Sequence, residues 1–286
     1  MFRKLLKYDM KAIWKYWWIL AVTTLGVSVV GGAALKHLIA FAPEETQGAG
    51  VLITIVCSLL FFISVIGIAV AFYGTAILLL VRFYKNLFTD EAYLTFTLPV
   101  KRRQILLSKI VNAMFWTVVH GIVLIISAFV ICVIAMPSSG GGFFNTEIIS
   151  GISNAVSGFI DLVGAWVIVY FIEALLLILL YTLFFINLMH MCITIGSIIA
   201  KKHKVLASIG VYYACNIAFS VIIYVGMFVV MVASTGIVTA IESAPVNIIH
   251  LLISLLALIV CAIVASFASI TYSVTQQLID RKLNLA

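Results

Sequence analysis

The run Met189-His190-Met191-Cys192 brings together three types of side chain that bind soft metal ions. It lies inside a long apolar segment, and adjacent residues of a helix point in different directions around the helix axis. We therefore expect these residues to pack in a core, and we predict no metal site. The cysteines also fall in apolar segments and form no Cys-x-x-Cys pair, which favours buried free thiols. They are Cys57, Cys132, Cys192, Cys215 and Cys261.

Motifs for nucleotide or peptide-bond chemistry are absent from the sequence. No Gly-x-x-x-x-Gly-Lys-Ser/Thr run is present to cradle ATP phosphates, and no His-Glu-x-x-His run is present to bind catalytic zinc. Serine, histidine and acidic residues show no spacing typical of a hydrolase. We predict that the chain is not an enzyme and carries no cofactor of its own. In an ATP-driven complex, ATP and Mg²⁺ would be bound by a separate subunit.

Composition sets the surroundings of these residues. Hydrophobic residues make up 65% of the 286 positions and charged residues 9%, whereas a soluble domain is about 45–50% apolar and about 25% charged. There is too little polar surface to cover a water-soluble protein of this length. The composition predicts an integral membrane protein and excludes a disordered chain, a collagen and a disulfide scaffold. We assign the net charge of +7 to the membrane surface and predict no nucleic-acid partner.

Uncharged segments long enough to cross a bilayer recur along the chain. A crossing helix needs about 20 apolar residues, and polar breaks such as Pro137–Gly142 mark where segments end. We predict an all-α, polytopic membrane protein in which residues 1–16 form an interfacial helix and residues 17–286 a six-span domain. The transmembrane helices are expected at about 17–39, 51–81, 108–136, 162–200, 205–235 and 247–276.

The distribution of basic residues predicts the orientation, because lysine and arginine accumulate on the cytoplasmic side of membrane proteins. With the N-terminus inside, 16 of the 17 basic residues fall in cytoplasmic segments and only Lys36 lies outside. We predict that both termini are cytoplasmic. We also expect no cleaved signal peptide, because the basic stretch is long and Trp17-Trp18 is typical of an interfacial aromatic belt.

Glu173 is the one acid within an apolar run, and an acid inside a membrane span is a functional hypothesis by default. It precedes Lys201, the predicted inner edge, by 28 residues, or roughly 42 Å of helix at about 1.5 Å per residue. This distance exceeds the roughly 30 Å hydrocarbon core. Glu173 is therefore expected near the outer interface, either as part of an outer gate or substrate exit or as a solvated interfacial acid.

Residues 2–17 form a helix pattern with two opposed faces. At about 100° per residue, an apolar stripe and a basic stripe fall on opposite sides. The apolar stripe consists of Phe2, Leu6, Met10, Ile13 and Trp17, and the basic stripe of Lys4, Lys7, Lys11 and Lys15. Such a helix lies in the headgroup plane with its lysines toward anionic lipid. We predict a membrane-surface anchor, with a simple charged flank as the alternative.

The segment 82–107 is the longest predicted cytoplasmic loop. Thr89 precedes two acids, an order that favours a helix start. Pro99 disfavours helix at the residue before it, so we predict a short transverse helix over 90–97. Its surface either touches lipid or docks a cytoplasmic partner. The residues of this surface are Phe88, Asp90, Glu91, Tyr93, Leu94 and Phe96.

Two stretches of the sequence resemble a known family. The N-terminal run KYDMKAIWKYWW and the run YLTFTLPVKRRQILLSKI at 93–110, together with six spans, are similar to the type-2 family of ABC transporter permeases of Gram-positive bacteria. The resemblance implies that the transverse helix is a coupling helix seated in a groove of an ATP-binding cassette ATPase subunit. It also implies a bacterial cell-membrane location and a small outer re-entrant element around 236–247.

These observations lead to one expected function and two alternatives. The expectation is the membrane-spanning permease subunit of an ATP-driven ABC exporter, paired with a second permease copy or a related permease. Its substrate would be amphipathic or apolar, such as an antimicrobial peptide, a lipid-like compound or a drug, because the spans are aromatic-rich and nearly uncharged. The alternatives are a membrane sensor or immunity protein that transports nothing, and a membrane enzyme acting on lipid or peptide.

Overall fold

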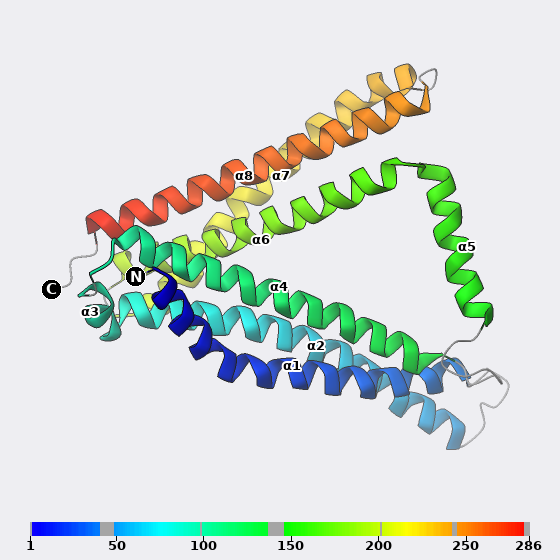
Figure 1. Ribbon diagram of the computed structural model, residues 1–286, viewed down its shortest axis with the longest axis horizontal. Helices are drawn as coiled ribbons and strands as arrows, with labels where there is room; N and C mark the ends of the chain where they lie inside the picture. Colours follow the sequence, from blue (N-terminus) through cyan, green and yellow to red (C-terminus); the bar gives the residue numbers. More distant parts are fainter. Residues whose placement is uncertain are drawn as a thin grey trace. The chain divides into compact units, whose positions relative to one another are not determined.

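The computed structural model describes residues 2–40, 49–97, 99–136, 146–200, 202–241 and 245–282, and it is helical nearly throughout these residues (Figure 1). The helices are α1 (Phe2–Ala40), α2 (Ala49–Phe88), α3 (Glu91–Phe96), α4 (Arg102–Ala135), α5 (Thr146–Val163), α6 (Trp166–Ile199), α7 (Lys204–Ile241) and α8 (Val246–Lys282). No strand occurs in the described ranges. The predicted break at Pro137–Gly142 lies outside them.

Six of the described helices are long and apolar enough to cross a membrane: α1, α2, α4, α6, α7 and α8. Each contains a predicted span, so the prediction of an all-α, polytopic membrane protein is confirmed. The exposed apolar surface explains why the chain needs lipid. Large apolar side chains such as Ile125, Phe171 and Tyr224 are about 70% exposed, at 71%, 69% and 71%, and only a bilayer can cover them.

Several helix ends differ from the predicted ones. α1 runs unbroken through residue 16, although Figure 1 shows that it changes direction after its first turns. α2 continues to Phe88 and α4 begins at Arg102, which leaves a connection shorter than the predicted loop 82–107. Charged residues such as Arg82 and Lys85 end a hydrophobic segment but favour helix, so the helices continue beyond the apolar core. α7 likewise runs to Ile241, and residues 242–244 of the expected outer element lie outside the described ranges.

The first of two compact units comprises Met1–Arg82 and Leu107–Gly158. In it, α1 contacts both α2 and α4 through small residues. A Cβ added at Gly31 would lie 2.9 Å from the Cβ of Ser64 on α2, and one added at Gly32 would lie 2.9 Å from the Cβ of Ile134 on α4. Small residues allow helix backbones in a membrane to approach closely, and these glycines explain how α1 packs against both α2 and α4.

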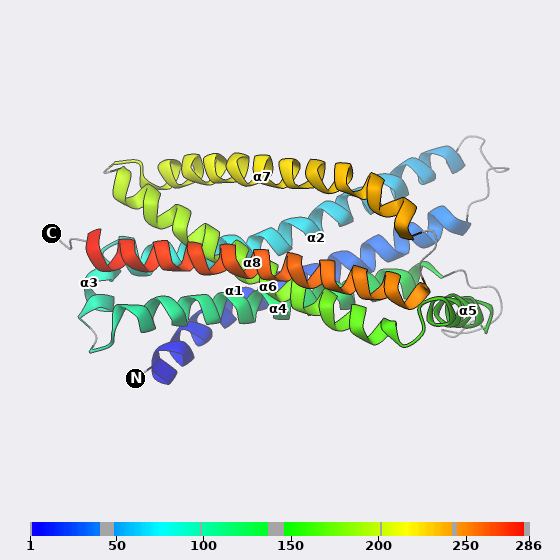
Figure 2. The ribbon, with the colours of Figure 1, turned by 90° about the horizontal axis from the view of Figure 1, so that it is seen from above.

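The second unit comprises Phe83–Leu106 and Phe159–Ala286. Its core lies among α6, α7 and α8, which Figure 2 shows from above. The rings of Phe184, Phe219 and Phe267, one from each helix, meet with centroids 5.3–6.1 Å apart. The amide of Asn187 donates a hydrogen bond of 3.1 Å to the carbonyl of Ala268 and ties α6 to α8.

The sequence reading did not predict α5, and it differs in kind from the spans. Its apolar residues at 156, 159, 160 and 163 recur every three or four positions, which places them on one helical face opposite the polar residues at 154, 157 and 161. Val156 and Phe159 are 52% and 56% exposed. A helix with this pattern is typical of the membrane interface. The turn between α5 and α6 contains Gly164 at φ +62°, a conformation that favours glycine.

Candidate functional site

The candidate site is the coupling surface, which we define as α3 and its flanking residues Phe88–Thr97. Tyr93 and Leu94 are each 68% exposed, whereas Ala92, on the opposite side of α3, is only 3% exposed. The helix therefore has one buried side and presents a tyrosine and a leucine outward. Asp90 and Glu91 are exposed beside them, and Phe88 and Phe96 are half-buried.

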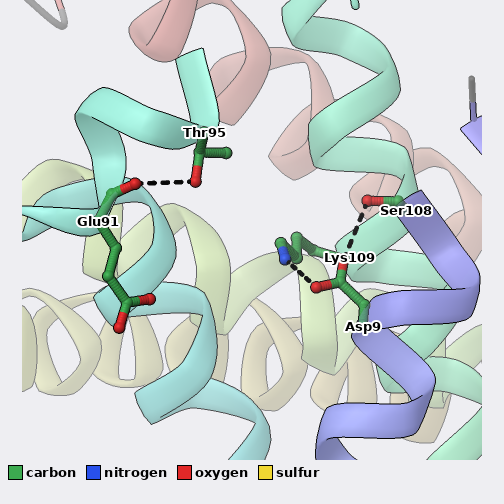
Figure 3. Close-up of polar contacts among 5 residues, drawn as sticks. All are labelled: Asp9, Glu91, Thr95, Ser108 and Lys109. Carbon is green, nitrogen blue, oxygen red and sulfur yellow. Dashed lines mark hydrogen bonds and ion pairs between the residues drawn. The ribbon is translucent and has the colours of Figure 1, made fainter. Parts of the chain in front are cut away.

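The start of α3 differs from the predicted capping. The hydroxyl of Thr89 donates to the carbonyl of Lys85 at 2.5 Å, back into the end of α2, and it caps nothing in α3. Asp90 occupies the N-cap position without a side-chain cap bond. A threonine that follows a helix can bond the carbonyl four residues before it. Because α2 extends to Phe88, the carbonyl of Lys85 is in reach, and the hydroxyl of Thr89 bonds to it instead of to α3. Inside α3, Thr95 donates to the carbonyl of Glu91 at 3.0 Å (Figure 3).

Arg102 fastens the coupling surface to the end of α8. Its guanidinium donates hydrogen bonds of 2.9 Å to the carbonyl of Ile279 and 3.1 Å to the carbonyl of Asp280. It also lies over the ring of Phe96, 5.4 Å from the centroid. The last carbonyls of a helix lack intrahelical partners and carry partial negative charge, so a cation there is stabilising. From the sequence Arg102 was only a basic flanking residue, and its partner lies too far along the chain to be inferred.

Two further contacts hold the base of the coupling surface within the second unit. The ring of Phe83, near the end of α2, stacks on His190 of α6 with centroids 3.8 Å apart and planes 19° apart. The ammonium of Lys204, at the start of α7, lies 3.4 Å from the carbonyl of Phe88. Together with Arg102, these contacts connect the helix ends on either side of α3 to each of the last three spans.

The predicted membrane-surface anchor keeps its two faces in the structure. Lys4, Lys7, Lys11 and Lys15 are exposed, and Phe2, Leu6 and Met10 are half-buried. Ile13 and Trp17, however, are 1% and 4% exposed. The centroid of the Trp17 ring lies 4.8 Å from that of the Trp116 ring on α4. At these two positions the stripe therefore packs on protein, and an anchoring role for the first turns stays a prediction.

A buried ion pair, missed in the sequence, joins the same stretch of α1 to α4. The ammonium of Lys109 lies 2.6 Å from Oδ1 of Asp9, and the two side chains are 5% and 7% exposed. The hydroxyl of Ser108 lies 3.5 Å from the other carboxylate oxygen (Figure 3). The sequence carries a signal for this pair, since Asp9 is four residues before Ile13 and so falls on the buried stripe. An acid on an apolar stripe needs a buried partner.

Glu173 lies in a polar cluster at the start of α6. It is 8% exposed and accepts a short hydrogen bond from the hydroxyl of Ser254 on α8. One turn away, the hydroxyl of Tyr170 lies 2.8 Å from Nδ1 of His250. The carboxyl is thus enclosed by protein and is not the solvated acid of the sequence analysis. Because Ser254 bonds to Glu173 and His250 to Tyr170, the cluster does not form the serine–histidine pair that activates a nucleophile.

The residues of the soft-metal run lie in a core, whereas the cysteines differ among themselves. Cys192 and Cys261 are buried and Cys57 and Cys215 half-buried, but Cys132 is exposed, so the prediction of a buried thiol is wrong there. His190 is 2% exposed and its ring stacks on that of Phe83. Cys192 belongs to a hydrophobic cluster with Leu188 and Met191. His120 bonds across helices, with Nδ1 2.9 Å from the hydroxyl of Thr75. All five cysteines are free. Among the described residues, no group of three or more His, Cys, Asp or Glu side chains is placed to hold a metal ion.

Comparison with protein-family models gave no match, and neither did comparison with curated proteins or with solved structures. The six membrane-competent helices by themselves define the class, that of an all-α, multi-pass membrane protein.

Proposed function

We propose that this chain is the membrane-spanning permease subunit of an ATP-driven ABC exporter, and that α3 is its coupling helix. The observation that carries the proposal is the coupling surface: a short helix with Tyr93 and Leu94 68% exposed, fastened at its base to the spans. Exposed apolar side chains on a firmly held element are typical of an interaction site. A flexible loop with the same residues would transmit no movement.

The contacts on either side of α3 indicate how movement would travel. A partner that closes on ATP would push on Tyr93 and Leu94. The push would reach α8 through Arg102, α7 through Lys204 and α6 through the stacked ring of Phe83. The coupling surface follows the second span along the chain, yet its contacts lead to the last three spans, and these would carry the conformational change.

The surfaces of the spans support the proposed substrate and assembly. Residues 221–228 of α7 are exposed on every side, which leaves surface for a second permease copy or a related permease in the membrane. The apolar, nearly uncharged spans suit an amphipathic or apolar substrate, such as an antimicrobial peptide, a lipid-like compound or a drug. ATP and Mg²⁺ would be bound by the partner ATPase, and Glu173 with Ser254 would form part of an outer gate.

The experiment is purification of the tagged protein from its native membrane with a measurement of copurifying ATPase. The double variant Tyr93→Asp and Leu94→Asp places charge in the contact, where a buried unpaired charge costs several kcal/mol. We expect it to insert normally and to lose the ATPase. Tyr8→Asp is the matched control, because Tyr8 is 70% exposed on α1. Full copurification of the double variant would contradict the proposal and favour plain lipid contact.

A further inference from the structure

A cavity of about 400 Å³ lies beside the turn between α6 and α7. One wall is Tyr84 of α2, one turn before Phe88. The other is the turn itself, where Lys202, His203 and Lys204 stand at consecutive positions. All of these residues belong to the second unit. The role proposed above uses only Lys204 among them, through its contact with Phe88.

The polar part of this cavity is chemically one-sided. Lys202 and His203 are exposed and offer an ammonium and an imidazole, and Tyr84 adds a phenol. Within the part of the chain that the structure describes, no acidic residue lines the cavity. α7 begins at Lys204, so its first backbone N–H groups, which have no intrahelical acceptor, add partial positive charge at the same place. A group bound among these donors carries negative charge.

The apolar part of the cavity restricts the ligand further. Val205, Leu206 and Ile209 line it next to the cations and are 58%, 68% and 46% exposed. They lie on the first turns of a helix that crosses the membrane. An inorganic anion would make no use of these side chains. The cavity therefore fits an amphiphile whose anionic head meets the turn and whose tail follows α7.

We propose that this cavity binds an anionic phospholipid, with the headgroup phosphate at Lys202, His203 and the start of α7. The acyl chain would pack along Leu206 and Ile209. Basic pockets between transmembrane helices at the cytoplasmic side bind anionic headgroups in this way. The inference does not depend on an ATPase partner. It rests on the cavity and on the prediction that the turn between α6 and α7 lies at the cytoplasmic side of the membrane.

The test is lipid retention by the purified protein, counted by native mass spectrometry after titration with phosphatidylglycerol or phosphatidylcholine. We expect saturable binding of phosphatidylglycerol and much weaker binding of phosphatidylcholine. Lys202→Gln should weaken phosphatidylglycerol about fivefold, the equivalent of about 1 kcal/mol per charge. Leu206→Gln should weaken it as well. Lys204 is left in place because its ammonium contacts the carbonyl of Phe88.

The control is Lys101→Gln, which removes the same charge from an exposed lysine outside the cavity and should leave the binding at this cavity unchanged. Size-exclusion profiles verify that each variant is folded, and Tyr84→Phe gives a milder second variant at the cavity. Equal binding of the two lipids, or equal weakening by Lys101→Gln and Lys202→Gln, would overturn the proposal. Displacement of the lipid by millimolar inorganic phosphate, with no effect of Leu206→Gln, would show a free-anion site and would also overturn it.

Discussion

The ion pair between Asp9 and Lys109 gives the sharpest test of how the first unit is held together. Replacing Lys109 with methionine leaves a carboxylate with 7% side-chain exposure, which also accepts a long hydrogen bond of 3.5 Å from the hydroxyl of Ser108. Removal of one partner of a buried pair costs about 3–5 kcal/mol. Asp9→Asn should also be destabilising, because it removes the negative charge that faces the ammonium.

The double variant Asp9→Leu and Lys109→Met should behave differently from both single variants. Replacement of both charges by apolar side chains of similar volume is neutral or stabilising in many buried pairs. We therefore expect the double variant to recover most of the stability that either single variant loses. Lys4→Met, on an exposed face of the same helix, is the control and should change stability by under about 0.5 kcal/mol.

The assay is thermal unfolding of the purified protein in a fixed detergent, followed by loss of helical circular dichroism. At about 2–4 °C per kcal/mol for a chain of this size class, the single variants should lower the Tm by roughly 6–20 °C. Single variants that unfold like the parent would refute the reasoning, since they would place the pair in solvent. A double variant as unstable as the single ones would refute it as well.

Three further predictions follow from the helix contacts and the topology. Gly196→Ala should lower the Tm strongly, because an added Cβ would collide with the backbone of α7 at Ser208, whereas Gly210→Ala has nothing within 4 Å and should be neutral or slightly stabilising. In a background without native cysteines, Asn154→Cys should react with an impermeant thiol reagent in intact cells and His203→Cys should not; the reverse would overturn the six-span orientation. A spin label at Phe159 should be more accessible to oxygen and less accessible to a water-soluble nickel chelate than one at Asn154, and equal accessibilities would exclude an interfacial α5.

The sequence was sufficient for the spans and for the existence of α3, because both depend on local patterns. Hydropathy alone locates a helix of 20 or more apolar residues, and Pro99 alone ends a helix before it. The exact helix ends could not be predicted as well, because Arg82 and Lys85 interrupt an apolar run without interrupting the helix.

The contacts that position the candidate site could not be predicted, because their partners are distant in the chain. Arg102 bonds the carbonyls of Ile279 and Asp280, and nothing local distinguishes it from its neighbour Arg103. Backbone carbonyls carry no sequence signal at all. Asp9 is an intermediate case, since its place on the buried stripe indicates a buried partner but does not identify Lys109.

The most direct test of the central claim is a crosslink from the coupling surface itself. A photoactivatable amino acid is placed at Leu94 and, as the control, at Tyr8, which is 70% exposed on α1. The protein is irradiated in its native membrane, and the adducts are identified by mass spectrometry. We predict that position 94 crosslinks to an ATP-binding cassette ATPase subunit and that position 8 does not. Adducts of lipid alone at position 94 would contradict the assignment of α3 as a coupling helix.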